Sequence, residues 1–366
     1  MKKRLGISLY PALADQQQSL DYLEMAAKYG FDILFLAFLG VNGTKEEIIK
    51  EYLPYTQKAK ELGFEIIADV NPAVFDMLGV NASLFRGPLD LSFFAELHID
   101  VMRLDYGMSS LEEAFLSKNE YGIKVCMNGG SIADHVGTVL AAGGEKSMIM
   151  GCHNYYPHRF TGILLERFMK ATEIWNKYNL RCAAFISSQQ PEAFGPWPVT
   201  EGLPTLEMHR DLPIEVQFKH LMMMDMVDDI IIGNCYASEA ELQALQQANT
   251  AVIEFHVHLT EGLPASMKER LHIQLSRRND TNEYMIRSLE SRLIKAKTEP
   301  FHTVDIHRGD VMIDNDLYGQ YSGEVQIALR DMPNYGKTNV VARIKEEEII
   351  LIDYLGGGQA FQFQEI

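Results

Sequence analysis

Eight short apolar runs recur along the first two-thirds of the chain, and they constrain the fold more than any other feature of the sequence. They are LGISLY (5–10), DILFLAFL (32–39), FEIIADV (64–70), DVMRLDY (100–106), IKVCMN (123–128), MIMGCHN (148–154), CAAFISS (182–188) and IIIGNCY (230–236). Runs of this length with almost continuous apolarity are typical of strands in a parallel sheet that helices cover on the outside.

Helix signals stand between these runs. Three Ser or Thr residues are followed three positions later by Glu, the spacing of a capping box in which each side chain bonds the other's backbone N–H: Thr44 with Glu47, Ser110 with Glu113, and Ser238 with Glu241. After Thr44 the apolar residues keep helical spacing until Gly63, which favours a left-handed stop. Pro54 lies inside this segment and predicts a kink or a break, because proline removes a helical hydrogen bond.

Eight strand–helix units within about 240 residues match a (β/α)8 barrel. An open, doubly wound sheet is the alternative, but the GxGxxG phosphate fingerprint does not follow the first run. The pattern changes near residue 250, where TAVIEFHVHLT, GEVQIAL (323–329) and EIILIDYL (348–355) indicate strands. We therefore predict an α/β chain with a TIM barrel over residues 1–248 and a small, mainly β domain over residues 249–366.

The net charge, the apolar runs and the cysteines limit which partners and which cellular compartment are expected. The net charge of −17 argues against nucleic acid or an anionic membrane as the main partner, although a local cluster of donors can still bind a small anion. The basic start MKKRLGISLYPAL lacks an apolar stretch of signal-peptide length, and no run approaches the ~20 apolar residues of a membrane span. We expect a cytoplasmic protein. The four cysteines lie in separate apolar runs without CxxC spacing, so they are predicted to be buried and not disulfide-bonded.

Functional residues of a parallel barrel lie at the C-terminal ends of its strands. The residues at those ends are polar, aromatic or amide-bearing, and they include Tyr10, Asp69, Asp105, Asn128, His153, Asn154 and Tyr236. Hydroxyls and amides hydrogen-bond sugar hydroxyls and acetamido groups, and aromatic faces stack on pyranose rings. Each of these residue types is common in turns at strand ends. The prediction of a sugar subsite therefore depends on their occurring together at most of the strand ends.

A metal site is not expected. Cys152 and His153 are adjacent in a strand, so their side chains point to opposite faces. His153 and His158 are separated by a turn that contains proline, and the paired histidines at 256 and 258 fit a solvated strand face. The sequence predicts neither a catalytic metal nor a cofactor.

Hydrolysis of a glycosidic bond without a metal uses two carboxylates, one of them protonated. The candidates are Asp69, Asp105, Glu201 and Glu207. Asp105 ends a strand, whereas Glu201 lies in a long loop near Trp197, where desolvation by the indole would raise the pKa of the carboxyl. Glu207 is expected to begin a helix, which a carboxylate stabilises there.

Several strings taken together are specific to one family. RLDYG (103–107), GCHNYYPHRFTG (151–162), EGLPTLEMHR (201–210), DDIIIGNCYAS (228–238) and RGDVMIDNDLYG (308–319) resemble the MupG-like family, and the resemblance extends from ISLYP to the C-terminal GGG. It implies a TIM barrel followed by a small cyclophilin-like β domain. It also implies an intracellular 6-phospho-N-acetylmuramidase, which splits the disaccharide of 6-phospho-N-acetylmuramic acid and N-acetylglucosamine during recycling of cell-wall peptidoglycan.

The resulting hypothesis assigns roles by chemistry. Asp105 and Glu201 form the carboxylate pair, with Glu201 as proton donor and Asp69 in reserve. The sugar subsite is lined by Tyr10, Asn128, His153, Asn154 and Tyr236. Arg159, together with Arg86 or a residue of the second domain, binds the 6-phosphate or the lactyl carboxylate, as guanidinium groups do. The helix that starts at Ser238 is a further anion candidate, but plain capping explains that serine better.

Two other functions remain open at this point. One is another barrel enzyme acting on phosphosugars, an isomerase or an aldolase. An aldolase needs a lysine near a strand end, and Lys124, the only strand lysine, stands early in its run. The other is a protein that binds a phosphosugar without turnover.

Overall fold

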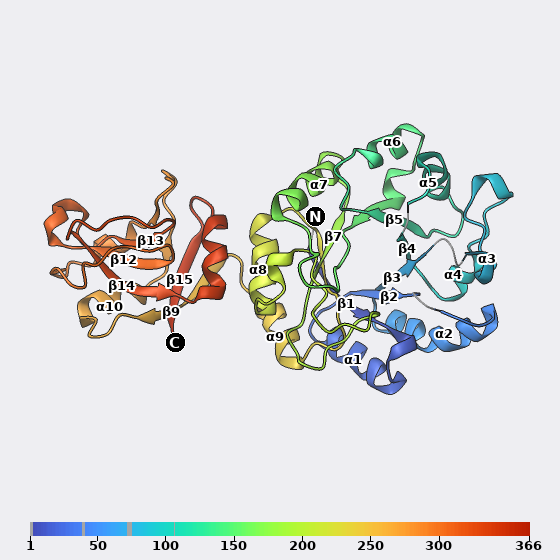
Figure 1. The fold of residues 1–366 in the computed structure, drawn as a ribbon, viewed down its shortest axis with the longest axis horizontal. Coiled ribbons are helices and arrows are strands. Elements are labelled where there is room, and N and C mark those ends of the chain that lie inside the picture. The colour runs from blue at the N-terminus through green and yellow to red at the C-terminus, as the bar shows by residue number, and fades with distance from the viewer. Residues whose placement is uncertain (1–2, 39–40, 72–74, 106) are drawn as a thin grey trace. The chain divides into compact units, whose positions relative to one another are not determined.

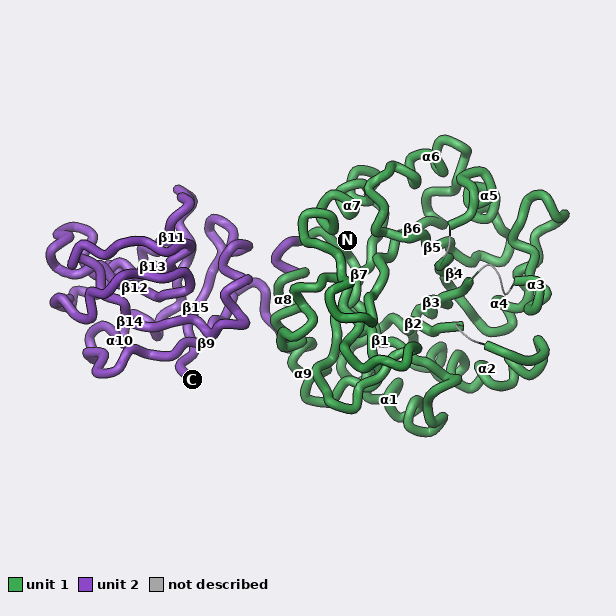
Figure 2. Tube along the Cα trace, in the orientation of Figure 1, with its two compact units in different colours: residues 1–221, 225–247 green, residues 222–224, 248–366 purple. Residues whose placement is uncertain are grey.

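The computed structural model describes residues 3–38, 41–71, 75–105 and 107–366. The chain divides into two compact units, one of residues 1–221 with 225–247 and one of residues 222–224 with 248–366 (Figure 2). Neither unit has a described helix that is both long and apolar enough to cross a membrane.

The first unit is a closed barrel of eight parallel strands in sequential order, with β8 pairing back to β1 (Figure 1). The strands are β1 (Arg4–Leu9), β2 (Ile33–Ala37), β3 (Glu65–Val70), β4 (Val101–Leu104), β5 (Lys124–Asn128), β6 (Ile149–Cys152), β7 (Cys182–Ile186) and β8 (Asp229–Ile232). Every predicted run supplies one of these strands, which confirms the eight-stranded barrel.

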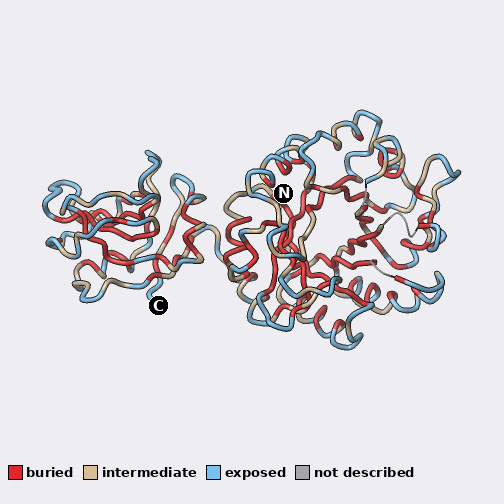
Figure 3. Tube along the Cα trace, in the orientation of Figure 1, coloured by how far each residue is buried: buried red, intermediate tan, exposed pale blue. Residues whose placement is uncertain are grey.

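The helices of this unit lie outside the ring of strands (Figure 1). They are α1 (Gln16–Lys28), α2 (Lys45–Glu61), α3 (Phe75–Leu78), α4 (Ser92–Glu96), α5 (Ser110–Leu116), α6 (His135–Ala141), α7 (Leu165–Lys177), α8 (Ile214–Met224) and α9 (Glu239–Gln247). The strands are buried on both faces, as their continuous apolarity predicts (Figure 3).

The local helix signals hold with two corrections. Thr44 and Glu47 form the predicted capping box of α2, and Gly63 follows that helix with a φ of 89°. Of the kink or break expected at Pro54, the break is wrong, because α2 is one helix from 45 to 61 that continues through the proline. The capping box of α5 uses Ser109 with the glutamate at 112, one position before the predicted pair.

The alternating pattern after residue 250 is confirmed for β9 (Val252–Leu259). That strand joins β10 (Leu275–Ser276), β11 (Met285–Arg287), β12 (Asp310–Asp314), β13 (Val325–Ala328), β14 (Thr338–Ile344) and β15 (Ala360–Glu365) in a seven-stranded sheet of order β10-β15-β9-β14-β12-β13-β11. The sheet is mixed, since β15 runs parallel to β9 and the other pairs are antiparallel. The α-helix α10 (Ala265–Leu271) also belongs to this unit.

One predicted strand of the second unit was wrong. The segment Glu346–Tyr354 is a 3-10 helix, although EIILIDYL is strongly β-like in composition. Its buried residues Glu348 and Leu351, and Ile349 and Ile352, are spaced by three, which is the period of a 3-10 helix. The carboxylate at 348 also accepts the backbone N–H of His256 at 2.7 Å, which fixes the segment against β9.

Candidate active site

Strand alternation determines which side chains enter the barrel. Its interior is filled by a cluster that includes Ile67, Val101, Cys126 and Cys152. Side chains two positions further along a strand share the same face. The interior positions that follow the cluster towards the C-terminal ends are therefore those of Asp69, Arg103, Asn128 and Asn154. All four cysteines of the chain are buried and free, as expected.

Arg103 is the centre of the polar group at this end of the barrel. Its Nη1 donates to Oδ1 of Asp69 and lies 3.7 Å from Oδ1 of Asp105, while its Nη2 donates to Oδ1 of Asn154. The side chains of Arg103 and Asp69 are each only 3% exposed, whereas that of Asp105 is 34% exposed. The structure thus brings two predicted carboxylates together around one cation, and Asp105 is the one that solvent reaches.

The two carboxylates differ in environment. Burial raises the pKa of Asp69, the adjacent Arg103 opposes the rise, and the negative charge of Asp105 adds to it. Asp69 is buried against the cation, whereas Asp105 on the same cation is open to solvent, so the two carboxylates are suited to different roles.

Two tyrosines lie beside this group. The ring of Tyr155 packs edge-to-face on Phe185 at 5.1 Å and on Phe35 at 6.2 Å between centroids, inside the barrel. The hydroxyl of Tyr10 is buried and donates to the carbonyl of Gly233. Burial raises the pKa of both phenols, and the charge of the aspartate at 69 raises that of Tyr155 further. Both phenols therefore stay protonated and are hydrogen-bond donors near neutral pH.

The loops after β6 and β7 are held together by a buried cation. Glu207 accepts from the backbone N–H groups of Phe160 at 2.7 Å and Gly162 at 2.8 Å, and from Nε and Nη2 of Arg210 at 2.8 and 2.7 Å. Arg210 in turn donates to the carbonyl of Tyr156 at 3.0 Å. The hydrogen bond from Arg210 lowers the pKa of Glu207 to about 2. Glu207 therefore fixes the two loops, and it begins a short 3-10 helix, Glu207–His209, as the sequence predicted.

Glu201 and Arg159 lie on these loops. One carboxylate oxygen of Glu201 accepts the backbone N–H of Arg159 at 2.7 Å. The guanidinium of Arg159 binds both oxygens of Asp211, at 2.6 and 3.0 Å. Glu201 is exposed, so the interaction with Arg159 orients it without removing it from solvent.

His153 lies on the other side of the barrel wall. Its Nε2 is 2.9 Å from the hydroxyl of Thr172 and its ring packs on Phe168, 4.6 Å away, both in α7. Burial lowers the pKa of this histidine to about 3, so it is neutral. The structure places His153 between strand and helix and does not bring it together with Asp69 and Asp105.

The remaining predicted residues lie near their strand ends with local partners. Oδ1 of Asn128 accepts the backbone N–H of Gly130 at 2.9 Å. The hydroxyl of Tyr236, half-buried, is 2.9 Å from that of Ser19. Arg86 forms an exposed ion pair with Asp76. Among the described residues, no group of three or more His, Cys, Asp or Glu side chains is arranged to hold a metal ion.

Sequence reasoning did not assign a role to Arg103 or Tyr155. An arginine inside an otherwise apolar run was the available signal for the first, because a buried cation needs a partner on a neighbouring strand. Tyr155 stood in the quoted loop string, but its direction depends on how the chain turns after β6, which alternation alone does not give.

Two family models match the chain and together cover nearly all of it. The model described as 6-phospho-N-acetylmuramidase, N-terminal, matches residues 5–247, and the model described as 6-phospho-N-acetylmuramidase, C-terminal, matches residues 253–364. No match was found among curated proteins.

Two solved structures are similar over their full length. An uncharacterised protein from B. cereus is 39% identical, with a TM-score of 0.86 and complete coverage of both chains. A conserved protein of unknown function from Enterococcus faecalis is 24% identical, with a TM-score of 0.74 over 99% of this chain and 96% of that one. The second likeness is evidence of the fold alone.

Proposed function

We propose, since this chain belongs to the 6-phospho-N-acetylmuramidase family, that it hydrolyses the bond between 6-phospho-N-acetylmuramic acid and N-acetylglucosamine. The family indicates a glycoside hydrolase with a phosphorylated sugar as substrate. The finer parts of the proposal are a role in peptidoglycan recycling in the cytoplasm and a cyclophilin-like second domain; they follow from the family resemblance and stay predictions.

The observation that carries the mechanism is the position of Arg103 between Asp69 and Asp105. A carboxylate that reacts must touch the sugar, and Asp105 is the more accessible of the two. Asp69 acts through Arg103 as a positioning residue, because its buried carboxylate fixes the guanidinium that faces Asp105. Asp105 is therefore assigned as one reacting carboxylate.

Glu201 is proposed as the second reacting carboxylate. It is exposed and is oriented by the backbone N–H of Arg159 on the loop after β6. One carboxyl group gives a proton to the leaving oxygen, while the other stabilises the positive charge that develops on the sugar ring or attacks it. The phenol of Tyr155 and the amide of Asn154, both beside the charged group, are suited to bind sugar hydroxyls.

Arg159 is the proposed ligand of the phosphate or of the lactyl carboxylate. Its present partner Asp211 is exposed, and exposed ion pairs contribute little, about 0–1 kcal/mol. A phosphate dianion binds a guanidinium more strongly than a single carboxylate does, so it can displace Asp211. Arg86, with its exposed partner Asp76, is the second candidate for the same reason.

A Schiff-base aldolase is less well supported. Lys124 lies at the N-terminal end of β5 and donates to Glu65 at 2.7 Å. It therefore belongs to the end of the barrel opposite to Asp105, and its amine is held in an ion pair with Glu65.

The experiment compares two substrates on the full-length protein. A chromogenic N-acetylmuraminide is assayed with and without the 6-phosphate, and Glu166→Gln, an exposed carboxylate of α7 paired with Lys170, is the control variant. We expect release of the chromophore from the phosphorylated compound and little from the other. Binding of the phosphorylated sugar without any release would favour a binding protein instead.

Asp69→Asn separates positioning from direct participation. If Asp69 acts through Arg103, the variant lowers kcat and shifts the acidic limb of the pH–rate profile, while KM changes little. If Asp69 itself touches the substrate, its loss equals that of Asp105→Asn. The anomeric configuration of the product, read by NMR, gives the carboxylate separation in the working enzyme, about 5–5.5 Å for retention and about 6.5–9.5 Å for inversion.

A further inference from the structure

The second unit contains a cavity of about 550 Å³ whose lining carries three cations. Arg270 comes from α10, and Arg292 and Lys295 come from the segment after β11. Gly319, Gln320 and Ser322 also line the cavity. All residues of this part of the chain are described, and the lining includes no carboxylate. The volume is within the range of small-molecule sites, about 300–1,000 Å³.

Arg270 is a buried cation whose hydrogen bonds to the described residues all go to neutral groups. It is 1% exposed. Its Nη1 donates to the carbonyls of Ser291 at 2.5 Å and Ile294 at 2.9 Å, and its Nη2 to the carbonyl of Ala296 at 2.7 Å and the hydroxyl of Thr298 at 3.3 Å. All these acceptors are neutral, and the Nε of Arg270 has no acceptor among the described residues.

A buried guanidinium of this kind is unfavourable unless an anion compensates it. Burial lowers the pKa of Arg270, and the charges of Asp316 and Glu269 oppose this shift only in part. An anion bound in the cavity would remove that unfavourable term, so binding would be favoured even in a chain whose net charge is −17.

The backbone is shaped to admit Arg270. Gly323 has a φ of 84°, and a Cβ at that position would stand 2.5 Å from Nη1 of the arginine. Any other residue would push the guanidinium aside. The glycine and the four neutral acceptors together hold the cation in one place at the cavity wall.

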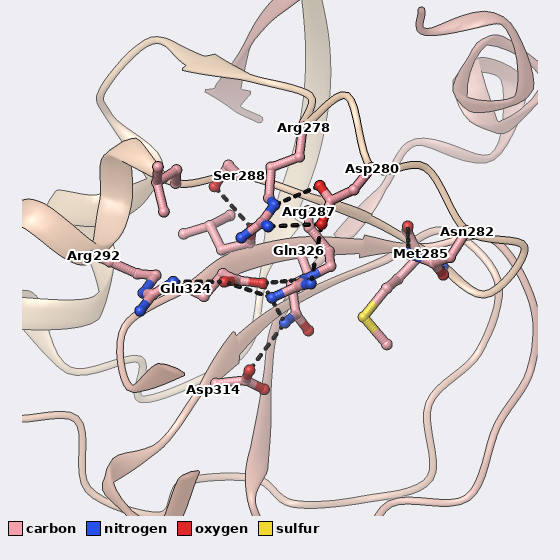
Figure 4. Close-up of polar contacts among 12 residues, drawn as sticks. Arg278, Asp280, Asn282, Met285, Arg287, Ser288, Arg292, Asp314, Glu324 and Gln326 are labelled. Carbon is pink, nitrogen blue, oxygen red and sulfur yellow. Dashed lines mark hydrogen bonds and ion pairs between the residues drawn. The ribbon is translucent and has the colours of Figure 1, made fainter. Parts of the chain in front are cut away.

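Arg292 is positioned by a second set of contacts, shown in Figure 4. The Nη1 of Arg292 is 3.5 Å from a carboxylate oxygen of Glu324 (Figure 4). The guanidinium of Arg292 also lies 5.3 Å from the ring centroid of Tyr321. Glu324 is fully buried and also binds Arg287 at 2.6 and 3.0 Å, as the dashed lines show. Because Arg287 already matches that carboxylate, the charge of Arg292 is only partly compensated from the protein side.

Two leucines complete the chemistry of the cavity. Leu289 is 50% and Leu293 is 74% exposed, and both line it. Exposed leucines beside cations suit a ligand with an anionic group and a carbon body. We propose that this cavity binds a small oxyanionic metabolite, a phosphate monoester or a carboxylate carried on a ring or short carbon chain. The site is independent of the barrel chemistry, and failure of the glycosidase proposal would leave it standing.

Hydrogen exchange on the full-length protein tests the site directly. The probes are glucose 6-phosphate for the phosphate class, glucuronate for the carboxylate class and glucose as the neutral control, at matched ionic strength. We expect one or both anions to slow hydrogen exchange in residues 289–296 and 319–322. Glucose should leave the exchange rates unchanged. Unchanged exchange in both segments with both anions would overturn the proposal.

A pair of lysines provides the matched variants. Lys295→Glu reverses a charge in the cavity lining, while Lys297→Glu reverses one on an exposed neighbour that pairs with Glu299 outside it. Loss of a charged hydrogen bond and addition of a repulsive charge should weaken binding about tenfold or more for Lys295→Glu only. Equal weakening by both variants would mean general charge attraction and no built site. Asp105→Asn, which the site does not involve, should bind as the wild type does.

Discussion

Asp69 and Arg103 stand opposite each other in the register of β3 and β4 and form an ion pair that is almost completely buried. Two charges in the interior are stable only while each has the other, and removing one leaves the second uncompensated. The same pair fixes the guanidinium that Asp105 and Asn154 approach. Stability and the proposed chemistry therefore depend on one contact.

Arg103→Leu should destabilise the barrel by about 3 kcal/mol, because Asp69 would remain buried without its cation. Both tryptophans of the chain, Trp175 and Trp197, belong to the barrel unit, so tryptophan fluorescence during urea unfolding reports on that unit. The double variant Asp69→Asn with Arg103→Leu should recover part of the loss. The coupling would be contradicted if the double variant lost at least as much free energy of unfolding as the two single variants lose together.

Gly151→Ala should cost about 1–3 kcal/mol, the usual effect of overfilling a packed interior. A Cβ at 151 would lie 2.6 Å from the indole of Trp175, which covers the outer face of β6. Trp175→Leu in the same chain should relieve the clash, so the double variant should be more stable than additivity predicts. Thermal unfolding of these variants is followed by circular dichroism, because Trp175→Leu removes one of the two tryptophans on which fluorescence depends.

Glu207→Gln should loosen the loops that carry Glu201 and Arg159. It removes the counter-charge of Arg210, which is 1% exposed in its side chain, and weakens the bonds to Phe160 and Gly162. We expect a loss of about 2 kcal/mol, reduced because Glu207 itself is 25% exposed. Limited proteolysis within residues 154–163 should become faster.

The pH dependence of Glu207 follows from its pKa of about 2. The folded-state value is below the unfolded one of about 4.3, so its stabilisation is present above that pH and is lost as the pH falls towards 2. Glu207→Gln should therefore flatten this part of the acid-unfolding curve, and Glu166→Gln, which removes an exposed carboxylate whose ion pair is screened by solvent, should flatten it much less. Equal curves for wild type and Glu207→Gln would contradict the assigned role.

Asp314 in the second unit predicts the opposite pH effect. Burial raises its pKa to about 6, Glu324 adds to the rise, and Thr338, Gln326 and Arg287 oppose it. Its folded-state pKa is above the unfolded value of about 3.9, so its favourable contribution is complete below pH 4 and is lost as the pH rises through 6. Relative to wild type, Asp314→Asn should gain about 2–3 kcal/mol between pH 4 and pH 7.

Hydrogen exchange of the β12 amides, corrected for intrinsic rates, measures that gain. Asp280→Asn, an exposed carboxylate that pairs with Arg278 in the same unit, is the control (Figure 4). If the difference in stability between Asp314→Asn and wild type did not change between pH 4 and pH 7, the raised pKa of Asp314 would be contradicted.

Much of the fold followed from periodicity, and the errors have local physical causes. The runs at 32–39 and 182–188 predict strands because β2 and β7 are covered on both faces. The segment 346–354 has a β-like composition, but the three-residue spacing of its buried positions is that of the 3-10 helix it forms. The alternation that excluded Cys152 and His153 as joint metal ligands also directs His153 away from the barrel interior, where Cys152 lies.

The site was only partly predictable. Strand ends and carboxylates identify Asp69 and Asp105 as candidates, because both depend on alternation within a strand. The loop contacts of Glu207 and Arg210 depend on two segments meeting in space, and spacing along one sequence does not contain that information. The incompletely compensated charge of Arg270 is likewise a property of packing.

The most direct test of the central claim is kcat/KM of Asp105→Asn on a chromogenic 6-phospho-N-acetylmuraminide, measured beside wild type and Glu166→Gln. The substitution keeps the size of the side chain, so folding, monitored by tryptophan fluorescence, should be unchanged. We predict a loss of about 100-fold or more, as expected when a reacting carboxylate is removed. Activity within a few-fold of wild type would contradict the assignment of Asp105 to the reaction.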